Sequence, residues 1–226
     1  MKDVVIIVAG GVGDRMQADM PKQFLELRGL PVIFHTLKRF ADYHAGLEFI
    51  VVIHPEYIEF FEELCKRYHF EFNGQVVAGG RTRYESVQNG IRAIQGDVSV
   101  VAIHDAVRPF VSGETLDRCF GGARAHGTAI PVVPVFDSLR QFEGIFSEPV
   151  NRELYRIVQT PQCFDAKLIK DAYNQEYRKS FTDDASVVEH MDIRLHLVEG
   201  NRLNFKLTTR EDMELAQAIC GEASYL

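Results

Sequence analysis

Cysteine is scarce in this sequence. Its four cysteines, Cys65, Cys119, Cys163 and Cys220, lie far apart, and no two of them form a Cys-x-x-Cys pair. This spacing argues against a disulfide framework and against a cysteine-ligated zinc site, so we expect buried free thiols. No apolar run approaches the roughly 18 residues that are needed to span a membrane. An apolar run already begins at Val4, which leaves no room for a signal peptide, and we therefore expect a cytoplasmic protein.

Positive charge is also in deficit. The chain has 25 Lys and Arg against 32 Asp and Glu, which gives a net charge of −7. A chain with this balance is not expected to bind nucleic acid in general, so any phosphate site must be a local cluster of cations. With 226 residues, 46% of them hydrophobic, residues 1–226 are expected to form one domain with a large core.

Several motifs of nucleotide and nucleophilic chemistry are missing. The P-loop pattern is absent, and the dinucleotide fingerprint fits Gly11 and Gly13 but meets Met16 where its third glycine belongs. This mismatch argues against the alternative of a nicotinamide-dependent oxidoreductase. There is no Gly-x-Ser-x-Gly elbow and no His/Cys cluster with metal-ligand spacing. We therefore predict neither an enzymatic nucleophile nor a protein metal site.

The most informative segment is the N-terminal one. The apolar run Val4–Val8 leads into Ala9-Gly10-Gly11-Val12-Gly13, with Arg15 and Pro21-Lys22-Gln23 following. The pattern is typical of a buried parallel strand that feeds a tight loop. Glycines expose backbone N–H groups, and two cations stand beside them, so the loop suits a polyphosphate. The simpler interpretation is a glycine turn after a first strand.

Strand-like runs alternate with helical patterns along the chain. The runs lie at Val4–Val8, Phe49–Ile53, Gln75–Ala78, Val98–His104, Thr128–Val135 and Ile193–Val198. Helical spacing is found at Pro31–Ala41, Pro55–Tyr68 and Thr82–Gln95. This alternation predicts an α/β fold with a Rossmann-like, mostly parallel sheet flanked by helices. Ligands of such sheets bind beyond the carboxyl ends of the strands.

A second glycine motif, Gly79-Gly80-Arg81-Thr82-Arg83-Tyr84-Glu85-Ser86, follows a strand and opens a helix. A helix cap at Thr82, completed as a capping box by Glu85, explains two of its residues. The cap does not explain the glycine pair, which lets a flat ring lie against the backbone. We assign no role to Arg81.

A third motif, His104-Asp105-Ala106-Val107-Arg108-Pro109, closes the fourth apolar run. Asp105 can accept hydrogen bonds from ribose hydroxyls or hold a Mg²⁺-bound water, and Arg108 can hold a phosphate. His104 is better explained as a satisfied core histidine.

The residue composition changes at Phe136–Val158: this segment is polar and has only scattered apolar residues. This segment cannot be a core strand of the sheet, and the two interpretations are a disordered excursion or a hairpin arm that docks elsewhere. Beyond it, Thr182–Glu189 and Thr209–Asp212 have helix-start chemistry. Lys206 lies in the strand-like pattern Gly200–Thr209, where a buried ammonium needs an anionic partner.

Together these motifs resemble the sugar-phosphate nucleotidyltransferases, and among them the 2-C-methyl-D-erythritol 4-phosphate cytidylyltransferase family, over nearly the whole chain. The resemblance implies transfer of a cytidylyl group from CTP to a polyol phosphate. It implies Mg²⁺ held mainly through CTP phosphates, and a homodimer that exchanges arms formed by residues 136–158. Within such folds a ribitol 5-phosphate cytidylyltransferase shares nearly all the motifs, and a non-catalytic nucleotide sensor is a further alternative.

The resemblance also implies roles for individual residues. The catalytic residues are Arg15, Lys22, Arg152 and Lys206. The nucleotide-binding residues are Ala9, Gly10, Gly11, Gly13, Gly79, Gly80, Ser86, Asp105 and Ala106. The acceptor-binding residues are Asp105, Arg108, Ser138, Arg152, Thr182 and Lys206, of which Ser138 and Arg152 serve the neighbouring subunit.

Overall fold

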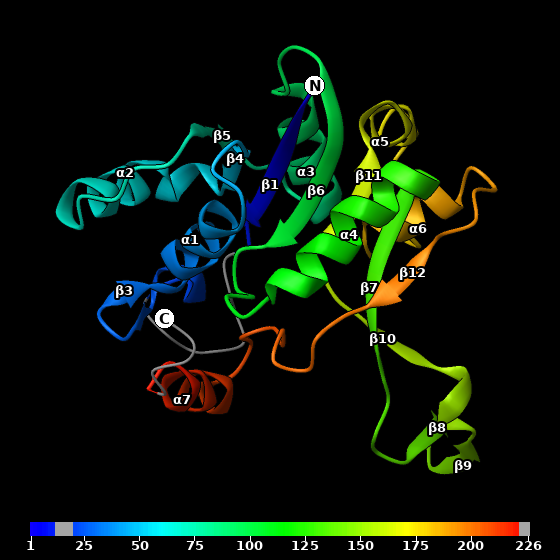
Figure 1. Ribbon diagram of the computed structural model, residues 1–226. Coiled ribbons are helices and arrows are strands. Elements are labelled where there is room, and N and C mark those ends of the chain that lie inside the picture. The colour runs from blue at the N-terminus through cyan, green and yellow to red at the C-terminus, as the bar shows by residue number, and fades with distance from the viewer. Residues whose placement is uncertain (12–19, 222–226) are drawn as a thin grey trace.

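The structure, a computed structural model, describes residues 1–11 and 20–221, so the predictions for Gly13 and Arg15 lie outside it. A central sheet has the strand order β10-β7-β11-β6-β1-β4-β5, and β12 also pairs with β7, parallel to it. Four neighbouring strands, β6, β1, β4 and β5, run parallel, whereas β11 runs antiparallel to β6 and β7 (Figure 1). The strands of the sheet are β1 (Lys2–Ala9), β4 (Glu48–Ile53), β5 (Gly74–Ala78), β6 (Val98–Asp105), β7 (Thr128–Pro134), β10 (Arg156–Val158), β11 (Gln162–Asp165) and β12 (Leu197–Glu199).

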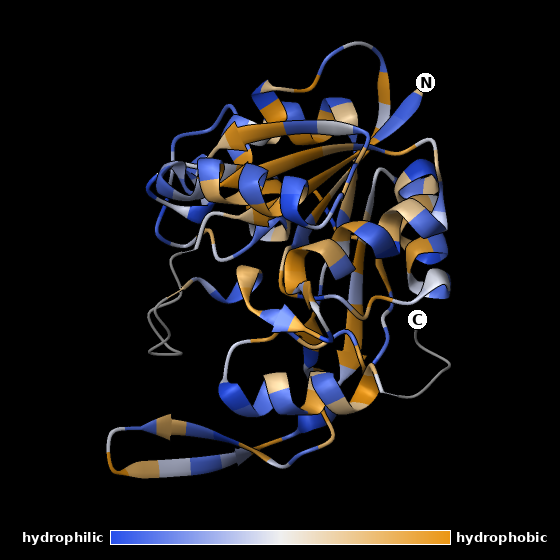
Figure 2. Ribbon diagram, turned by 90° about the vertical axis from the view of Figure 1, so that its left-hand side faces the viewer, coloured by the Kyte–Doolittle hydropathy of each residue, from blue (hydrophilic) through white to orange (hydrophobic). Residues whose placement is uncertain are grey.

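Helices cover both faces of this sheet. Alternate side chains of β1 point to opposite faces and pack against different helices. Val5 and Ile7 pack in a cluster with α1 (Val32–Tyr43), α2 (Ile58–Arg67) and α4 (Gly113–His126). Val4 and Ile6 pack in a second cluster with α3 (Arg83–Arg92), α5 (Ala166–Ala172) and α6 (Asp184–Glu189). Because both faces are buried, the strands read as continuous apolar runs, which Figure 2 shows as hydrophobic strands between the helices.

Helix α3 lies close against the sheet because of a glycine. A Cβ at Gly90 would lie 2.9 Å from Cγ2 of Ile6 and 3.0 Å from Cγ2 of Val52, which is closer than normal packing allows. This contact holds α3 against β1 and β4, and Ser86 near the start of α3 lies beside Gly10, which follows β1.

A smaller third cluster joins both ends of the described chain. Helix α7 (Arg210–Ile219) packs with the short strand β2 (Glu26–Leu27), which pairs with β3 (Leu30–Pro31). Thr209 and Asp212 form the capping box of α7, as the sequence predicts. Within the described residues, no helix is long and apolar enough to cross a membrane.

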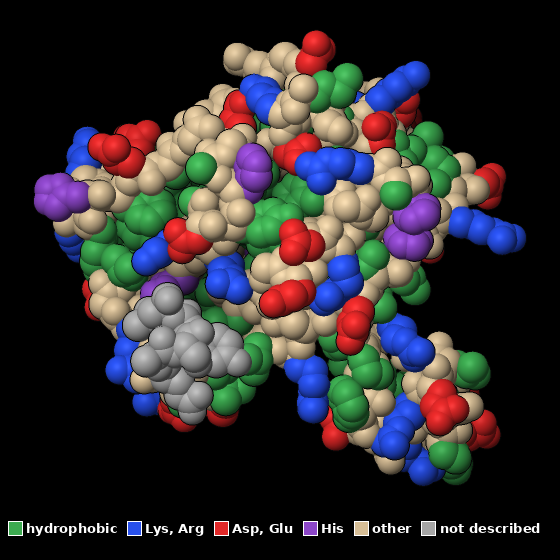
Figure 3. All heavy atoms as spheres, viewed as in Figure 1, with side chains coloured by type: hydrophobic (Ala, Val, Ile, Leu, Met, Phe, Trp, Pro, Cys, Tyr) green, Lys and Arg blue, Asp and Glu red, His purple; other side chains and the backbone are tan. Residues whose placement is uncertain are grey.

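The hairpin arm is present but shorter than predicted. Strands β8 (Leu139–Glu143) and β9 (Phe146–Val150) form a two-stranded sheet that stands clear of the body (Figures 1 and 3). A 3-10 turn, η3 (Arg152–Leu154), follows them. The last residues of the predicted arm, Arg156–Val158, instead pair with β7 at the edge of the central sheet. We therefore use "arm" for residues 136–155.

The α/β fold with a mostly parallel sheet is confirmed, and three local predictions are wrong. The last predicted strand, Ile193–Val198, is only the short β12. The strand-like segment Gly200–Thr209 is irregular: the N–H of Gly200 donates to Val132 of β7, but the N–H of Leu207 donates to the loop residue Val107. The Thr82 hydroxyl accepts from the N–H of Glu85 as predicted, but the Glu85 carboxylate accepts from the N–H of Arg81, so the capping box is half formed.

Candidate active site

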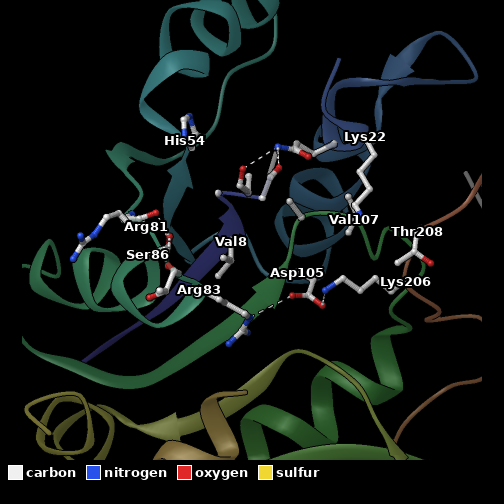
Figure 4. A pocket seen from close by; sticks show the side chains of 17 residues that line it. Val8, Lys22, His54, Arg81, Arg83, Ser86, Asp105, Val107, Lys206 and Thr208 are labelled. Carbon is white, nitrogen blue, oxygen red and sulfur yellow. Dashed lines mark hydrogen bonds and ion pairs between the residues drawn. The ribbon is translucent and has the colours of Figure 1, made fainter. Parts of the chain in front are cut away.

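A cavity of about 530 Å³ opens beyond the carboxyl ends of β1, β4 and β6. Among the described residues, its walls also include the start of α3, Lys22 and Gln23, and Lys206 and Thr208 (Figure 4). The sheet places it there because parallel strands that end at one edge leave their following loops side by side.

The first wall is the loop after β1. The Gln23 side-chain amide donates to the carbonyl oxygens of Ala9, at 2.9 Å, and Gly11, at 3.2 Å. Gln23 belongs to the 3-10 turn η1 (Lys22–Phe24), and Phe24 anchors this turn in an edge-on contact with Phe60. The turn brings Lys22 to the cavity wall beside the glycine loop.

The second wall is the loop before α3, and Ser86 holds it. The Ser86 hydroxyl accepts from the N–H of Gly80 at 3.1 Å and donates to the carbonyl oxygen of Thr82 at 2.9 Å. A Cβ at Gly10 or Gly79 would lie only 3.0 or 3.1 Å from this hydroxyl. The glycines of both loops are therefore needed for close packing around Ser86, in addition to any contact with a ligand.

Asp105 lies at the centre of a charge cluster. Its carboxylate is 3.1 Å from the Lys206 ammonium, 3.1 Å from Nε of Arg108 and 3.9 Å from Nε of Arg83. Lys206 and Arg83 reach it from opposite sides (Figure 4). Burial alone would raise the pKa of Asp105, but Lys206, Arg83 and Arg108 together hold this pKa well below its usual range. Asp105 is therefore ionised, and it is the anionic partner predicted for Lys206.

His104 is a core histidine, as the sequence predicts. Its side chain is fully buried, Nε2 donates to the carbonyl oxygen of Arg108, and Nδ1 accepts from the Thr160 hydroxyl, both at 3.0 Å. Burial lowers the pKa of His104 to about 4, so the ring is neutral near pH 7. The Thr160 hydroxyl also accepts from the N–H of Asp105, which ties the third motif to the segment that follows the arm.

Most predicted nucleotide-binding residues line the cavity, and most predicted acceptor-binding residues do not. Nine predicted residues are in its walls: Ala9, Gly10, Gly11, Lys22, Gly80, Ser86, Asp105, Ala106 and Lys206. Arg108 turns its guanidinium onto Asp105 and the carbonyl oxygen of Asn204. Thr182 borders a separate shallow depression next to Arg83. Ser138 and Arg152 are exposed on the arm, where Arg152 bonds to the carbonyl oxygen of Phe136.

Arg83 is the main residue that the sequence prediction missed. It lines the cavity, pairs with Asp105 and forms two hydrogen bonds to Asp184. The only signal was a cation at the first position of a helix, where the helix dipole disfavours it. Gln23, His54 and Thr208 also lie in the walls without having been assigned roles.

The side chains around the cavity include few ligands for Mg²⁺. This ion prefers oxygen ligands and commonly binds through substrate phosphates plus one or two carboxylates. Asp105 is the one carboxylate among the described residues that line the cavity. Within residues 1–11 and 20–221, no three His, Cys, Asp or Glu side chains are grouped to hold a metal ion. This donor set fits a metal held mainly by the phosphates of a bound nucleotide, with Asp105 as the available protein ligand.

Two glycine loops at the ends of parallel strands, faced by Lys22, Arg83 and Lys206, are the arrangement typical of an α/β protein that binds a nucleotide. The particular family follows from comparison with known proteins. Residues 4–222 match the family model described as IspD, 2-C-methyl-D-erythritol 4-phosphate cytidylyltransferase, and the chain belongs to this family.

Relatives cover almost the whole chain. The 2-C-methyl-D-erythritol 4-phosphate cytidylyltransferase of Bacteroides thetaiotaomicron is 48% identical over 219 residues, which is 97% of this chain and 100% of that protein. The enzyme of the same name from Porphyromonas gingivalis is 46% identical over 219 residues, covering 96% of this chain and 97% of its own.

Solved structures give the same result. The 4-diphosphocytidyl-2C-methyl-D-erythritol synthase of Anaerococcus prevotii superposes with a TM-score of 0.82 at 29% identity, covering 98% of this chain and 97% of its own. The 2-C-methyl-D-erythritol 4-phosphate cytidylyltransferase of Thermus thermophilus has a TM-score of 0.79 at 32% identity, covering 98% and 100%.

Proposed function

We propose that this protein condenses CTP with 2-C-methyl-D-erythritol 4-phosphate, giving 4-diphosphocytidyl-2-C-methyl-D-erythritol and pyrophosphate in non-mevalonate isoprenoid biosynthesis. The observation that carries the proposal is the cation-lined cavity between two glycine loops in a chain of this family. The relatives quoted above are named for the methylerythritol substrate, which favours it over ribitol 5-phosphate.

The reaction is an in-line substitution at phosphorus. A phosphate oxygen of the acceptor forms a bond to the α-phosphorus of CTP. The bond between the α-phosphorus and the oxygen that bridges the α- and β-phosphates breaks, and pyrophosphate leaves with that electron pair. No enzymatic nucleophile is required, so the protein acts by positioning and by stabilising charge.

Lys22, Arg15 and Lys206 would reduce the electrostatic repulsion between CTP and the acceptor phosphate, which are both anions. Lys22 lies beside the glycine loop, where we place the triphosphate, and Arg15 follows that loop in the sequence. Lys206 stands across the cavity beside Asp105, where we place the attacking phosphate. Preorganised cations of this kind stabilise the charge that develops in the transition state without reorganising.

We further propose that Mg²⁺ binds with CTP, with Asp105 as its available protein ligand. When bound, the ion neutralises charge on the phosphate oxygens. Asp105 stays ionised because of its three cationic neighbours, so its carboxylate is available as an acceptor for ribose hydroxyls or metal-bound water.

A homodimer with exchanged arms completes this proposal. The arm stands clear of the body of its own chain (Figure 1), and Ser138 and Arg152, which it carries, do not line the cavity. Its residues Phe136, Phe142, Ile145 and Phe146 are exposed. An isolated two-stranded hairpin is marginal in water, so docking on a second copy would stabilise the arm and bring Arg152 to the neighbour's acceptor. The free thiols and the nucleotide substrate support a cytoplasmic location.

The test is pyrophosphate release from CTP, ATP, GTP and UTP, each with methylerythritol phosphate or ribitol 5-phosphate as acceptor and Mg²⁺ present. We expect turnover with CTP and methylerythritol phosphate, because a pocket formed by glycine backbone leaves little room for a purine. Equal rates with ATP would contradict the nucleotide assignment. Preference for ribitol 5-phosphate would contradict the acceptor assignment, and no turnover with any pair would contradict an enzymatic role.

A further inference from the structure

Two helices of the molecule meet head to head through one ion pair. Arg83 is the first residue of α3, and Asp184 is the first residue of α6. NH1 and NH2 of Arg83 donate to Oδ1 and Oδ2 of Asp184 at 2.8 and 2.6 Å. Asp184 is fully buried, and the Tyr173 hydroxyl donates to its Oδ1 at 2.6 Å. The carboxylate therefore accepts three hydrogen bonds, two from the first residue of α3 and one from Tyr173 at the C-terminal end of α5.

The position of Arg83 is unfavourable in its own helix. A cation at the N-terminus of a helix opposes the helix dipole, so local propensity does not explain an arginine there. The two carboxylates that face it do explain it, since Arg83 lies between Asp184 and Asp105. Arg83 thus connects the nucleotide cavity with the segment that contains Thr182.

That segment is held rigidly on its other side as well. The buried Gln162 of β11 donates to Asp183 at 2.8 Å and accepts from the N–H of Ala185 at 2.7 Å. Because β11 pairs with β6, which ends in Asp105, both anchors of the segment lead back to the cavity. The start of α6 therefore has a defined distance from the nucleotide loops.

Stability alone is a poor explanation for the ion pair. A buried ion pair generally contributes no more to stability than an apolar pair of the same volume, because both charges must be desolvated. The bidentate geometry, however, fixes the relative orientation of the two groups in a way that an apolar contact does not.

We propose that Arg83 and Asp184 are positioning residues for the acceptor: their ion pair holds the Thr182 segment at a fixed distance from the nucleotide loop. This rests on the proposed function. Arg83 acts through Asp184 on Thr182 and through Asp105 on Lys206, so it aligns both predicted acceptor contacts. Asp184 does not line the nucleotide cavity, so its loss weakens use of the acceptor far more than binding of CTP.

The first experiment compares the steady-state kinetics of Asp184→Asn, which keeps the size of the side chain, with the wild type. Displacement of an acceptor contact by about 1 Å costs about 10²-fold in rate, so we expect kcat/KM for the polyol phosphate to fall about 10²-fold, with KM for CTP nearly unchanged. Arg83→Lys should act in the same direction, because an ammonium cannot replace a bidentate guanidinium.

A second variant separates positioning from folding. Arg83→Met with Asp184→Leu and Tyr173→Phe removes all three polar partners and leaves an apolar contact, which should preserve the melting temperature. We expect this triple variant to lose kcat/KM like Asp184→Asn. The matched control is Arg124→Gln with Asp3→Asn, which removes an ion pair between α4 and β1 and should leave the kinetics unchanged. A stable triple variant with wild-type kcat/KM would overturn the proposal.

Hydrogen exchange tests the same proposal without turnover. The amides of Thr182 and Asp183 are bonded to the Ser186 hydroxyl, and that of Ser186 to Asp183. We expect exchange of these amides to become about tenfold faster in the triple variant. If the wild type is inactive with both polyol phosphates, the proposed function fails, while exchange still decides on the ion pair: unchanged rates would refute its positioning role.

Discussion

Lys22 lines the cavity beside the loop over which we propose that the triphosphate binds. Its backbone belongs to a turn that Gln23 holds against the glycine loop. We expect Lys22→Ala to reduce kcat by about 10²–10³-fold with a much smaller change in CTP affinity, because the cation is placed where charge develops. Pyrophosphate release gives kcat, and calorimetry gives the CTP affinity. Arg15→Ala should act in the same way.

The matched control for Lys22 is Lys38→Ala, which removes an exposed lysine from α1 and should leave both quantities at wild-type values. If Lys22→Ala turned over at the wild-type rate, the placement of the triphosphate over this loop would be wrong.

His104 makes stability dependent on pH. An unfolded histidine has a pKa near ~6.5, whereas burial lowers the pKa of His104 to about 4. Between pH 6.5 and 4, His104 is protonated in the unfolded chain but neutral in the folded chain. The free energy of unfolding therefore decreases as pH falls from 6.5 towards 4. At pH 5 we expect this residue to account for about 2 kcal/mol of lost free energy of unfolding. Urea unfolding at pH 7.5 and pH 5 measures it.

The His104→Gln variant should be less stable than the wild type at pH 7.5, but it should lose less stability between the two pH values. His69→Asn, at an exposed residue with a positive φ of 49°, is the control and should keep the wild-type slope. Equal slopes for all three proteins would show that His104 does not titrate as described.

Residues differ in how well the sequence reveals them. Lys206 was predicted to need an anion because a buried ammonium without one is costly. The anion is present as Asp105, although the Lys206 side chain is 40% exposed. Arg83 could not be assigned, because the helix cap at Thr82 already explains its motif and its partner Asp184 is 101 residues away. Only the fold brings these two side chains together.

At the scale of elements, the loop before α3 tolerates no side chain at Gly80. A Cβ there would lie 2.3 Å from Cβ of Glu85, so the loop must shift in a Gly80→Ala variant. We expect KM for CTP to rise about tenfold, which corresponds to about 1.4 kcal/mol of lost binding. Gly121→Ala in α4, where nothing lies within 4 Å of the added Cβ, is the control and should not change KM. An unchanged KM for Gly80→Ala would remove this loop from the nucleotide site.

Elements buried on both faces were predictable, and those at the edges were predictable only in part. Strands β1, β4 and β6 follow from apolar runs, because helices cover both faces of the parallel part of the sheet. The edge strand β5 was also predicted, although none of its residues is fully buried. Arg156–Val158 carries no such signal, since this edge strand is exposed along its length. The alternating pattern of Gly200–Thr209 suggested a strand, but Asn204 and Leu207 bond to the backbone of loop residues instead.

In a homodimer with exchanged arms, each active site takes residues from two chains. A mixed dimer of an Arg152→Ala chain and a Lys22→Ala chain has one site that lacks both residues and one that is intact, if arms are exchanged. We expect mixing to restore about half the activity of a normal dimer per heterodimer, provided that the two sites act independently. Differently tagged chains allow the heterodimer to be isolated and assayed.

The control for this complementation pairs Lys22→Ala with Lys206→Ala. Both residues line the cavity of one chain, so every site of this heterodimer lacks one of them and stays inactive. Absence of recovery in the Arg152 heterodimer would show that each arm serves its own chain or that Arg152 has no part in the reaction.

The exposed arm also has a consequence for catalysis in dilute solution. Phe142 and Phe146 are each 74% exposed and Ile145 is 90% exposed, so the arm tip has no core of its own to fold against. If the partner supplies that core, dissociation separates Arg152 from its site and leaves two folded but idle chains. Dilution should then lower the specific activity, because dissociation of the dimer follows the law of mass action. The cellular concentration of the chain would set the fraction of chains that are dimeric and active.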